Sequence, residues 1–199
     1  MTTKNILIDW KYSGTPDGFF GTGSTTMEQG IVWLFGCAGA MLLGWVWWTN
    51  SISWTWWQYA IAALIALDVL GGVVANSLNS CKRFYHSPLQ SEETGFTAFA
   101  KNHFMFTALH IHPVLIGLLF GNFNWTYGLF WYAILLLSAV VILRIPLYLQ
   151  RPASMGIIML AALFNFYIIP PVSGFEWLVP ALFLKIVYGH LVHEEPYRP

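Results

Sequence analysis

Six histidines and one acidic residue inside an apolar run are the side chains of this sequence that could do chemistry. His103 and His110 share one helical face at i and i+7, and His190 and His193 share another at i and i+3. Neutral imidazoles from two helices, completed by a carboxylate or water, suit a zinc ion. The pattern therefore predicts a metal site held by His190, His193 and either His103 or His110. Asp68 would accept the proton of a metal-bound water.

The same residues allow two other arrangements. Asp68 and Lys185 both lie near the middle of predicted spans, where two buried opposite charges should pair. This pair would be structural or would relay a proton or substrate in a transporter, and it would weaken Asp68 as a base. Haem b is the second alternative, ligated by His103 or His110 opposite His190. Without any ligand, the histidines would be interfacial or hydrogen-bonded core residues.

The composition indicates that these residues belong to a membrane protein. The chain has 199 residues, of which 57% are hydrophobic and 9% are charged, whereas soluble domains carry roughly 25% charged residues. Too few polar side chains remain to cover a water-facing surface, so we predict one polytopic membrane domain. The formal net charge is zero, which gives no reason to expect a nucleic-acid partner. Cys37 and Cys81 form no disulfide framework and no paired metal motif.

Six segments are apolar over about 20 residues, the length that spans a bilayer, and they cover about 30–49, 55–78, 102–121, 125–148, 153–170 and 175–193. We therefore predict an all-α bundle of six transmembrane helices over 29–194, with a long loop at 79–101. An N-terminal segment, 1–28, precedes the bundle and a short tail, 195–199, follows it. The N-terminal segment lacks the apolar run of a signal peptide and has a short amphipathic stretch around 6–10.

The charges predict the orientation of the bundle. Basic residues fall on one side of the predicted spans and are absent from the loops of the other side; they are Lys4, Lys11, Lys82, Arg83, Lys101, Arg144, Arg151 and Arg198. The positive-inside rule makes this side, with both termini, cytoplasmic. Tryptophans cluster on the opposite side as an aromatic belt, namely Trp45, Trp47, Trp48, Trp54, Trp56, Trp57, Trp125 and Trp177. We expect a multi-pass protein of the cell inner (plasma) membrane.

Polar residues inside the spans should face protein or water. Asp68, Gly72 and Asn76 follow one another at i, i+4 and i+8, so they share one helical face. Arg144 adds a polar core group from another span. Pro113 should bend its helix and expose a backbone oxygen beside two histidines.

Three stretches carry a resemblance to known proteins. The run DVLGGVVAN at 68–76, with KRFYH at 82–86 and HLVHEEPY at 190–197, resembles a family of small uncharacterised bacterial polytopic membrane proteins. A looser likeness is to the intramembrane zinc hydrolases of the alkaline ceramidase and adiponectin-receptor type. That likeness implies a site made of Asp68, one histidine of the third span, and the two histidines of the last span. The last pair is spaced HxxH, where those hydrolases have HxxxH.

Together these observations predict a membrane-embedded, metal-dependent enzyme, a hydrolase with Zn²⁺, that acts on a lipid or other apolar substrate at the cytoplasmic side. A small transporter that uses Asp68 and Lys185 is the main alternative. A haem-binding protein, or a non-catalytic subunit of a membrane complex, is a further one. Membrane lipids are the expected partners, with a homo-oligomer as another option.

Overall fold

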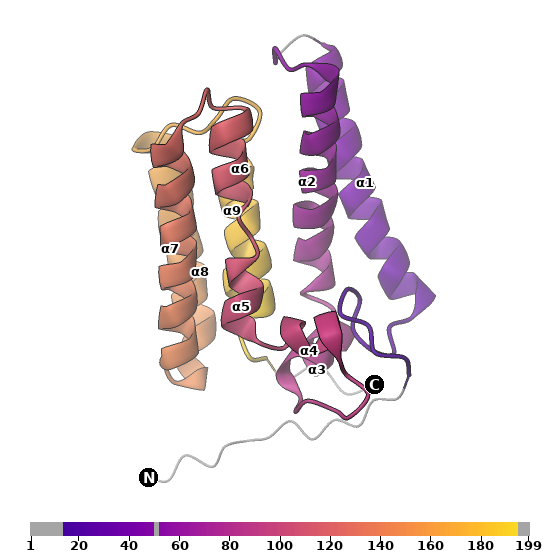
Figure 1. Ribbon diagram of the computed structural model, residues 1–199. Helices are drawn as coiled ribbons and strands as arrows, with labels where there is room; N and C mark the ends of the chain where they lie inside the picture. The colour runs from indigo at the N-terminus through magenta and orange to yellow at the C-terminus, as the bar shows by residue number, and fades with distance from the viewer. Residues whose placement is uncertain (1–13, 50–51, 195–199) are drawn as a thin grey trace.

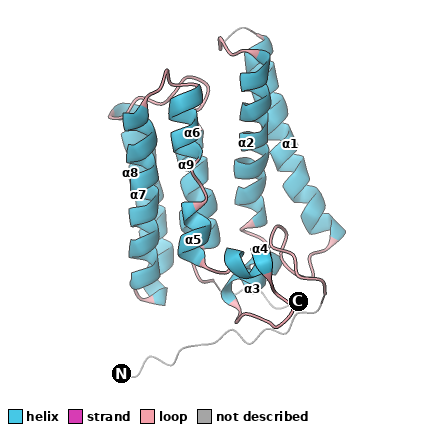
Figure 2. Ribbon diagram, in the orientation of Figure 1, coloured by secondary structure: helices cyan, strands magenta, loops and turns pink. Residues whose placement is uncertain are grey.

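The structure is a computed structural model that describes residues 14–49 and 52–194, and helices joined by loops make up these ranges (Figure 2). Within them no residue forms a β-strand, which confirms the predicted all-helical class. The amphipathic stretch at 6–10 and the tail at 195–199 lie outside the described residues.

Two long helices, α1 and α2, form an antiparallel pair on one side of the molecule (Figure 1); they are Thr26–Trp48 and Trp56–Ala75. A capping box between Thr25 and Glu28 starts α1, so the helix begins slightly before the predicted end of the N-terminal segment. The pair crosses at Gly36 and Gly71, where a Cβ on either glycine would lie within 3.6 Å of the other Cα. Small residues here allow the two backbones to approach closely.

The second group of helices stands beside this pair (Figure 1) and contains α7, α8, α9 and η1, which are Trp125–Arg144, Leu147–Tyr167, Leu178–Phe183 and Leu184–His190. The boundary between α7 and α8 lies at Ile145 and Pro146, earlier than predicted, because Pro146 cannot continue a helix and holds Ile145 extended. The last predicted span is α-helical at first and becomes a π-helix, η1, at Leu184. Such π-helical turns are rare and frequently mark functional sites.

The predicted span at 102–121 is broken into two short helices, α5 and α6, which are His103–Ala108 and His112–Leu119. Pro113 explains the break, because it has no N–H to bond the carbonyl four residues earlier, at Leu109, and its ring excludes that carbonyl, whereas a proline is tolerated in the first turn of α6. The expected bend is therefore a full interruption at residues 109–111. This interruption changes the direction in which the neighbouring histidines point.

The predicted loop at 79–101 contains two short helices, α3 and α4, at one pole of the molecule (Figure 1); they are Asn79–His86 and Gly95–Ala100. The basic residues of α3 indicated a loop, but its other face is buried through Cys81, Phe84 and Tyr85. Residues 18–20 pack on this face, where Tyr85 Oη donates a 2.7 Å hydrogen bond to the Gly18 carbonyl.

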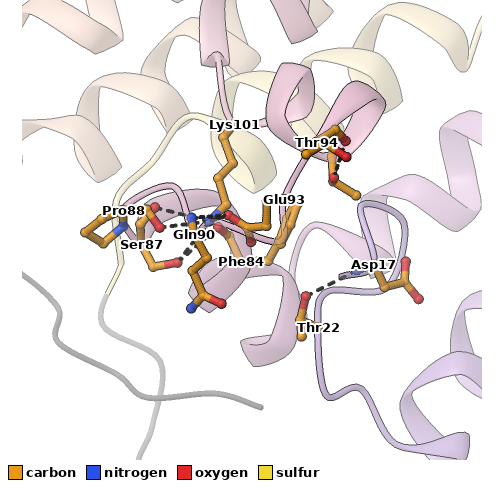
Figure 3. A network of polar contacts seen from close by, with 10 residues as sticks. Asp17, Thr22, Phe84, Ser87, Pro88, Gln90, Glu93, Thr94 and Lys101 are labelled. Atoms are coloured by element: carbon orange, nitrogen blue, oxygen red, sulfur yellow. Dashed lines mark hydrogen bonds and ion pairs between the residues drawn. The ribbon is translucent and has the colours of Figure 1, made fainter. Parts of the chain in front are cut away.

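A buried ion pair holds the chain between α3 and α4 (Figure 3). Lys101 Nζ lies 2.6 Å from a Glu93 carboxylate oxygen, and it also donates to the Pro88 carbonyl at 3.1 Å. The same ammonium group lies 5.0 Å from the centre of the Phe84 ring, which is a cation–π distance. These contacts fix the loop against the pole of the bundle.

Within the described ranges, four helices are long and apolar enough to cross a membrane, namely α1, α2, α7 and α8. These four helices agree with the prediction that the chain is a membrane protein. The other two predicted spans correspond to shorter apolar stretches, His103–Leu119 and Leu178–His190. Six spans, cytoplasmic termini and the inner membrane stay predictions.

Candidate functional site

The polar face of α2 packs against η1. Lys185 Nζ, from the π-helix, lies 2.7 Å from Asp68 Oδ2, as the ion-pair alternative predicted. Asn76 Nδ2 donates a 3.0 Å hydrogen bond to the Lys185 carbonyl. Gly72 lies between them and leaves the space that the Lys185 methylenes occupy. Asp68, Gly72 and Asn76 therefore all lie against Lys185, at its ammonium group, its methylenes and its backbone carbonyl respectively.

His112 completes this group, although the sequence patterns did not assign it a role. Its Nε2 lies 3.2 Å from Asp68 Oδ2, the oxygen that also accepts from Lys185. His112 is the first residue of α6, directly after the break in the predicted span. The histidine spacing alone therefore gave no signal for this contact.

A cavity of about 690 Å³ opens beside Asp68, between α1 and α2 on one side and α5 and α6 on the other. The Asp68 side chain is 45% exposed, whereas Lys185 behind it is 5% exposed, so the carboxylate is the charged group that faces the cavity. Apolar side chains make up most of the remaining wall. Trp33, Leu64 and Leu109 line it and are each more than half exposed on the outer surface.

His110 lines the same cavity but lies apart from the other predicted ligands. Its Nδ1 donates to the Phe106 carbonyl at 2.8 Å, and its ring centre is 5.5 Å from that of His112. Phe106 stacks on His190 at 4.2 Å and separates this region from the pole.

Four histidines gather at the pole, and we call this set, His86, His103, His190 and His193, the histidine cluster. His103 Nδ1 lies 3.1 Å from His190 Nε2. The His86 ring stacks between those of His103 and His193, with centres 4.7 and 4.8 Å away. His86 was missed because it lies in the predicted loop, where its only mark was its place at the end of the basic run KRFYH. A second cavity, of about 540 Å³, is lined by three members of the cluster.

The predicted ligands are thus divided, with His103, His190 and His193 at the pole and His110 beside Asp68. Among the described residues, no group of three or more His, Cys, Asp or Glu side chains could hold a metal ion. His86 stacks on His103 and His193, whereas His103 and His190 meet edge-on. Zinc and haem b stay predictions of the sequence.

Burial controls the ionisation of the groups around the cluster on α3. It lowers the pKa of His86 well below its ordinary value, and the neighbouring His103 lowers the pKa further. Burial also lowers the pKa of Lys82 to about 8, against the opposing effect of Glu194. Lys82 Nζ donates to the Val192 carbonyl at 2.9 Å and thereby satisfies backbone acceptors just after η1.

The predicted polar core is correct for two of three residues. Asn76 and Lys185 are buried at 3% and 4% exposure. Arg144 was wrongly placed in the core, because it is exposed in the last turn of α7.

No protein-family model, curated protein or solved structure matches this chain.

Proposed function

We propose that the protein is a membrane enzyme that binds a lipid-like amphiphile in the cavity and acts on its polar end at Asp68. The observation that carries this proposal is a carboxylate facing a cavity whose other walls are mostly apolar. A cavity of this size and polarity is typical of sites for small apolar ligands. A carboxylate at this depth in a bundle of apolar helices is costly and is expected to be functional.

The contacts of Asp68 suggest how it would work. Lys185 and His112 both approach Oδ2, which orients the carboxylate and leaves Oδ1 for a substrate. Oδ1 would accept a hydrogen bond from a substrate hydroxyl, amine or bound water and would thereby orient that group for reaction. The ion pair with Lys185 weakens Asp68 as a base, so His112, which shares Oδ2, would be the group that takes up and returns the proton, as in general acid–base catalysis.

Substrate entry would be lateral, from the bilayer. Exposed apolar side chains at Trp33, Leu64 and Leu109 border the cavity and would contact lipid chains. Leu64→Trp should obstruct this entrance, whereas Leu160→Trp on α8, which is similarly exposed, should not.

We propose that the pole with α3 and α4 lies on the cytoplasmic side of the inner membrane, as the basic residues there suggest.

The test uses purified protein in phosphatidylethanolamine–phosphatidylglycerol vesicles, incubated with long-chain alcohols, amines, amides and acylglycerols. Mass spectrometry then identifies products. We expect turnover of at least one class by the wild type and a loss of about a hundredfold in Asp68→Asn. Because Asp68→Asn leaves Lys185 without its counter-charge, the variant Asp68→Asn/Lys185→Gln is measured beside it. Wild-type turnover by both variants, or no product from any class, would refute the proposal.

A transporter is the second candidate, favoured by the 2.7 Å pair between Asp68 and Lys185. Such pairs act as relays in transporters. In the same vesicles, a carrier would move a labelled amphiphile or protons across the bilayer without chemical change, and Asp68→Asn would stop this movement. The zinc prediction is tested separately, by elemental analysis of the purified protein with and without added Zn²⁺.

A further inference from the structure

The polar groups next to Asp68 direct their hydrogen-bond donors into the protein. Lys185 and His112 both bond the Asp68 carboxylate, and the Asn76 amide bonds the Lys185 carbonyl. Tyr85, farther along the same cavity, donates its hydroxyl to the Gly18 carbonyl. Each of these groups therefore uses a donor inside the protein, and the Lys185 ammonium is only 5% exposed.

Two acceptor atoms remain beside them. Both donors of Asp68 approach Oδ2, so Oδ1 keeps its acceptor capacity. A carbonyl can only accept, so the contact between His110 Nδ1 and the Phe106 carbonyl requires the proton on Nδ1. The Nε2 atom of a neutral His110 is then an acceptor as well. The cavity thus offers acceptors to the polar end of its ligand.

The charge that faces the cavity is negative. Asp68 is 45% exposed and Lys185 is 5% exposed, so a ligand meets the carboxylate before the ammonium group. An anionic head group, such as a carboxylate or phosphate, would bring acceptors to acceptors and like charge to like charge. Leaving a buried polar group without its partner is costly, which makes such a mismatch selective.

We propose that the cavity selects a single-chain amphiphile whose polar end donates hydrogen bonds and carries no negative charge, a long-chain alcohol or amine. The volume of about 690 Å³ lies in the range that encloses one drug-sized molecule. This selectivity rests on the proposed function, because it concerns the substrate of the same site. The selectivity adds to that function the chemical class of the substrate's head group.

The experiment uses four photoactivatable probes that share one C16 chain with a diazirine and differ in the head group, which is alcohol, amine, carboxylic acid or methyl ester. Each is irradiated with the purified protein in detergent micelles, and peptide mapping locates the label. We expect the alcohol and the amine to label cavity residues about tenfold more than the acid and the ester. The comparison of alcohol with amine distinguishes a neutral donor from a cationic one.

Asp68→Asn/Lys185→Gln should reduce this tenfold preference to less than about threefold, because it removes the accepting carboxylate and its counter-charge together. Glu92→Gln, which removes an exposed carboxylate of the loop after α3, should leave the preference unchanged. Equal labelling of the cavity by all four probes would overturn the selectivity while leaving the binding function intact. Head-group selectivity without any product from the vesicle assay would instead overturn the proposed enzyme and leave the selectivity standing.

Discussion

The two polar regions of this protein accommodate polar side chains among apolar helices in different ways. The group at Asp68 joins opposite charges from α2 and η1 and places an imidazole beside them. The histidine cluster stacks imidazoles from α3, α5 and the end of η1 without a carboxylate among its members. Buried charges need partners, whereas neutral imidazoles pack as aromatic rings. The first region therefore depends on the pairing of opposite charges, and the second depends on the packing of its rings and on their neutral state.

The largest effect should come from removing one charge of the first region. Asp68→Leu leaves the buried Lys185 ammonium without a counter-charge and should lower the free energy of unfolding by about 3 to 5 kcal/mol. Asp68→Leu/Lys185→Met removes both charges and should recover most of this loss. Denaturant titration in detergent, followed by circular dichroism, measures both. A double variant as unstable as the single one would show that the pair is not what holds α2 to η1.

Truncation of a buried histidine in the histidine cluster should have the next largest effect. His190 is fully buried, and its ring contacts Phe106 and Tyr85 as well as His103. His190→Ala should lower the free energy of unfolding by about 2 to 4 kcal/mol, as for other buried aromatic residues. His193→Ala, at the half-buried end of the cluster, should cost about 1 kcal/mol. Equal losses would contradict the packing described here.

The close contact between α2 and η1 gives a third test. A methyl group at Gly72 would collide with the Lys185 methylenes, so Gly72→Ala should cost about 1 to 3 kcal/mol. Gly30→Ala in α1 has no atom within 4 Å of the new Cβ and should be neutral or slightly stabilising. The same denaturant titration compares the two variants. A neutral Gly72→Ala would mean that Lys185 takes another path to Asp68.

The smallest effect is the pH dependence of the second region. The pKa of His86 is lowered in the folded protein, so this ring stays neutral where the unfolded chain, with a pKa of about 6.5, takes up a proton. The unfolded state then binds more protons, and the free energy of unfolding should fall as pH falls below about 6.5. The slope is at most about 1.4 kcal/mol per pH unit for this one group.

His86→Asn removes that contribution and should flatten the fall in thermal midpoint between pH 7.5 and 5. Gln29→Asn, far from the cluster in sequence and at the start of α1, serves as a control that keeps the wild-type slope. An unchanged slope in His86→Asn would show that the ring is protonated at the same pH in both states.

Much of the framework could be predicted from the residues alone. Long apolar runs indicate long helices regardless of their partners, so α1, α2, α7 and α8 were expected, with ends shifted by a few residues at Pro146 and Ala75. The shared face of Asp68, Gly72 and Asn76 follows from helical periodicity. The need of Asp68 for a partner follows from the cost of a buried charge, and Lys185 was the partner proposed.

Local geometry and contacts between distant segments decided the rest. Whether Pro113 bends or breaks its helix depends on the packing around it. His112, directly after the break, meets Asp68, and the Phe106 ring lies between His110 and His190. The burial of α3, and with it the place of His86, depends on residues 18–20 packing against it. The amino-acid sequence by itself determined an apolar helical protein with an acid inside an apolar helix that needs a partner, because hydrophobicity and charge act residue by residue. Only the tertiary structure decided which imidazoles meet and where a cavity opens, because these depend on the relative positions of segments far apart in the chain.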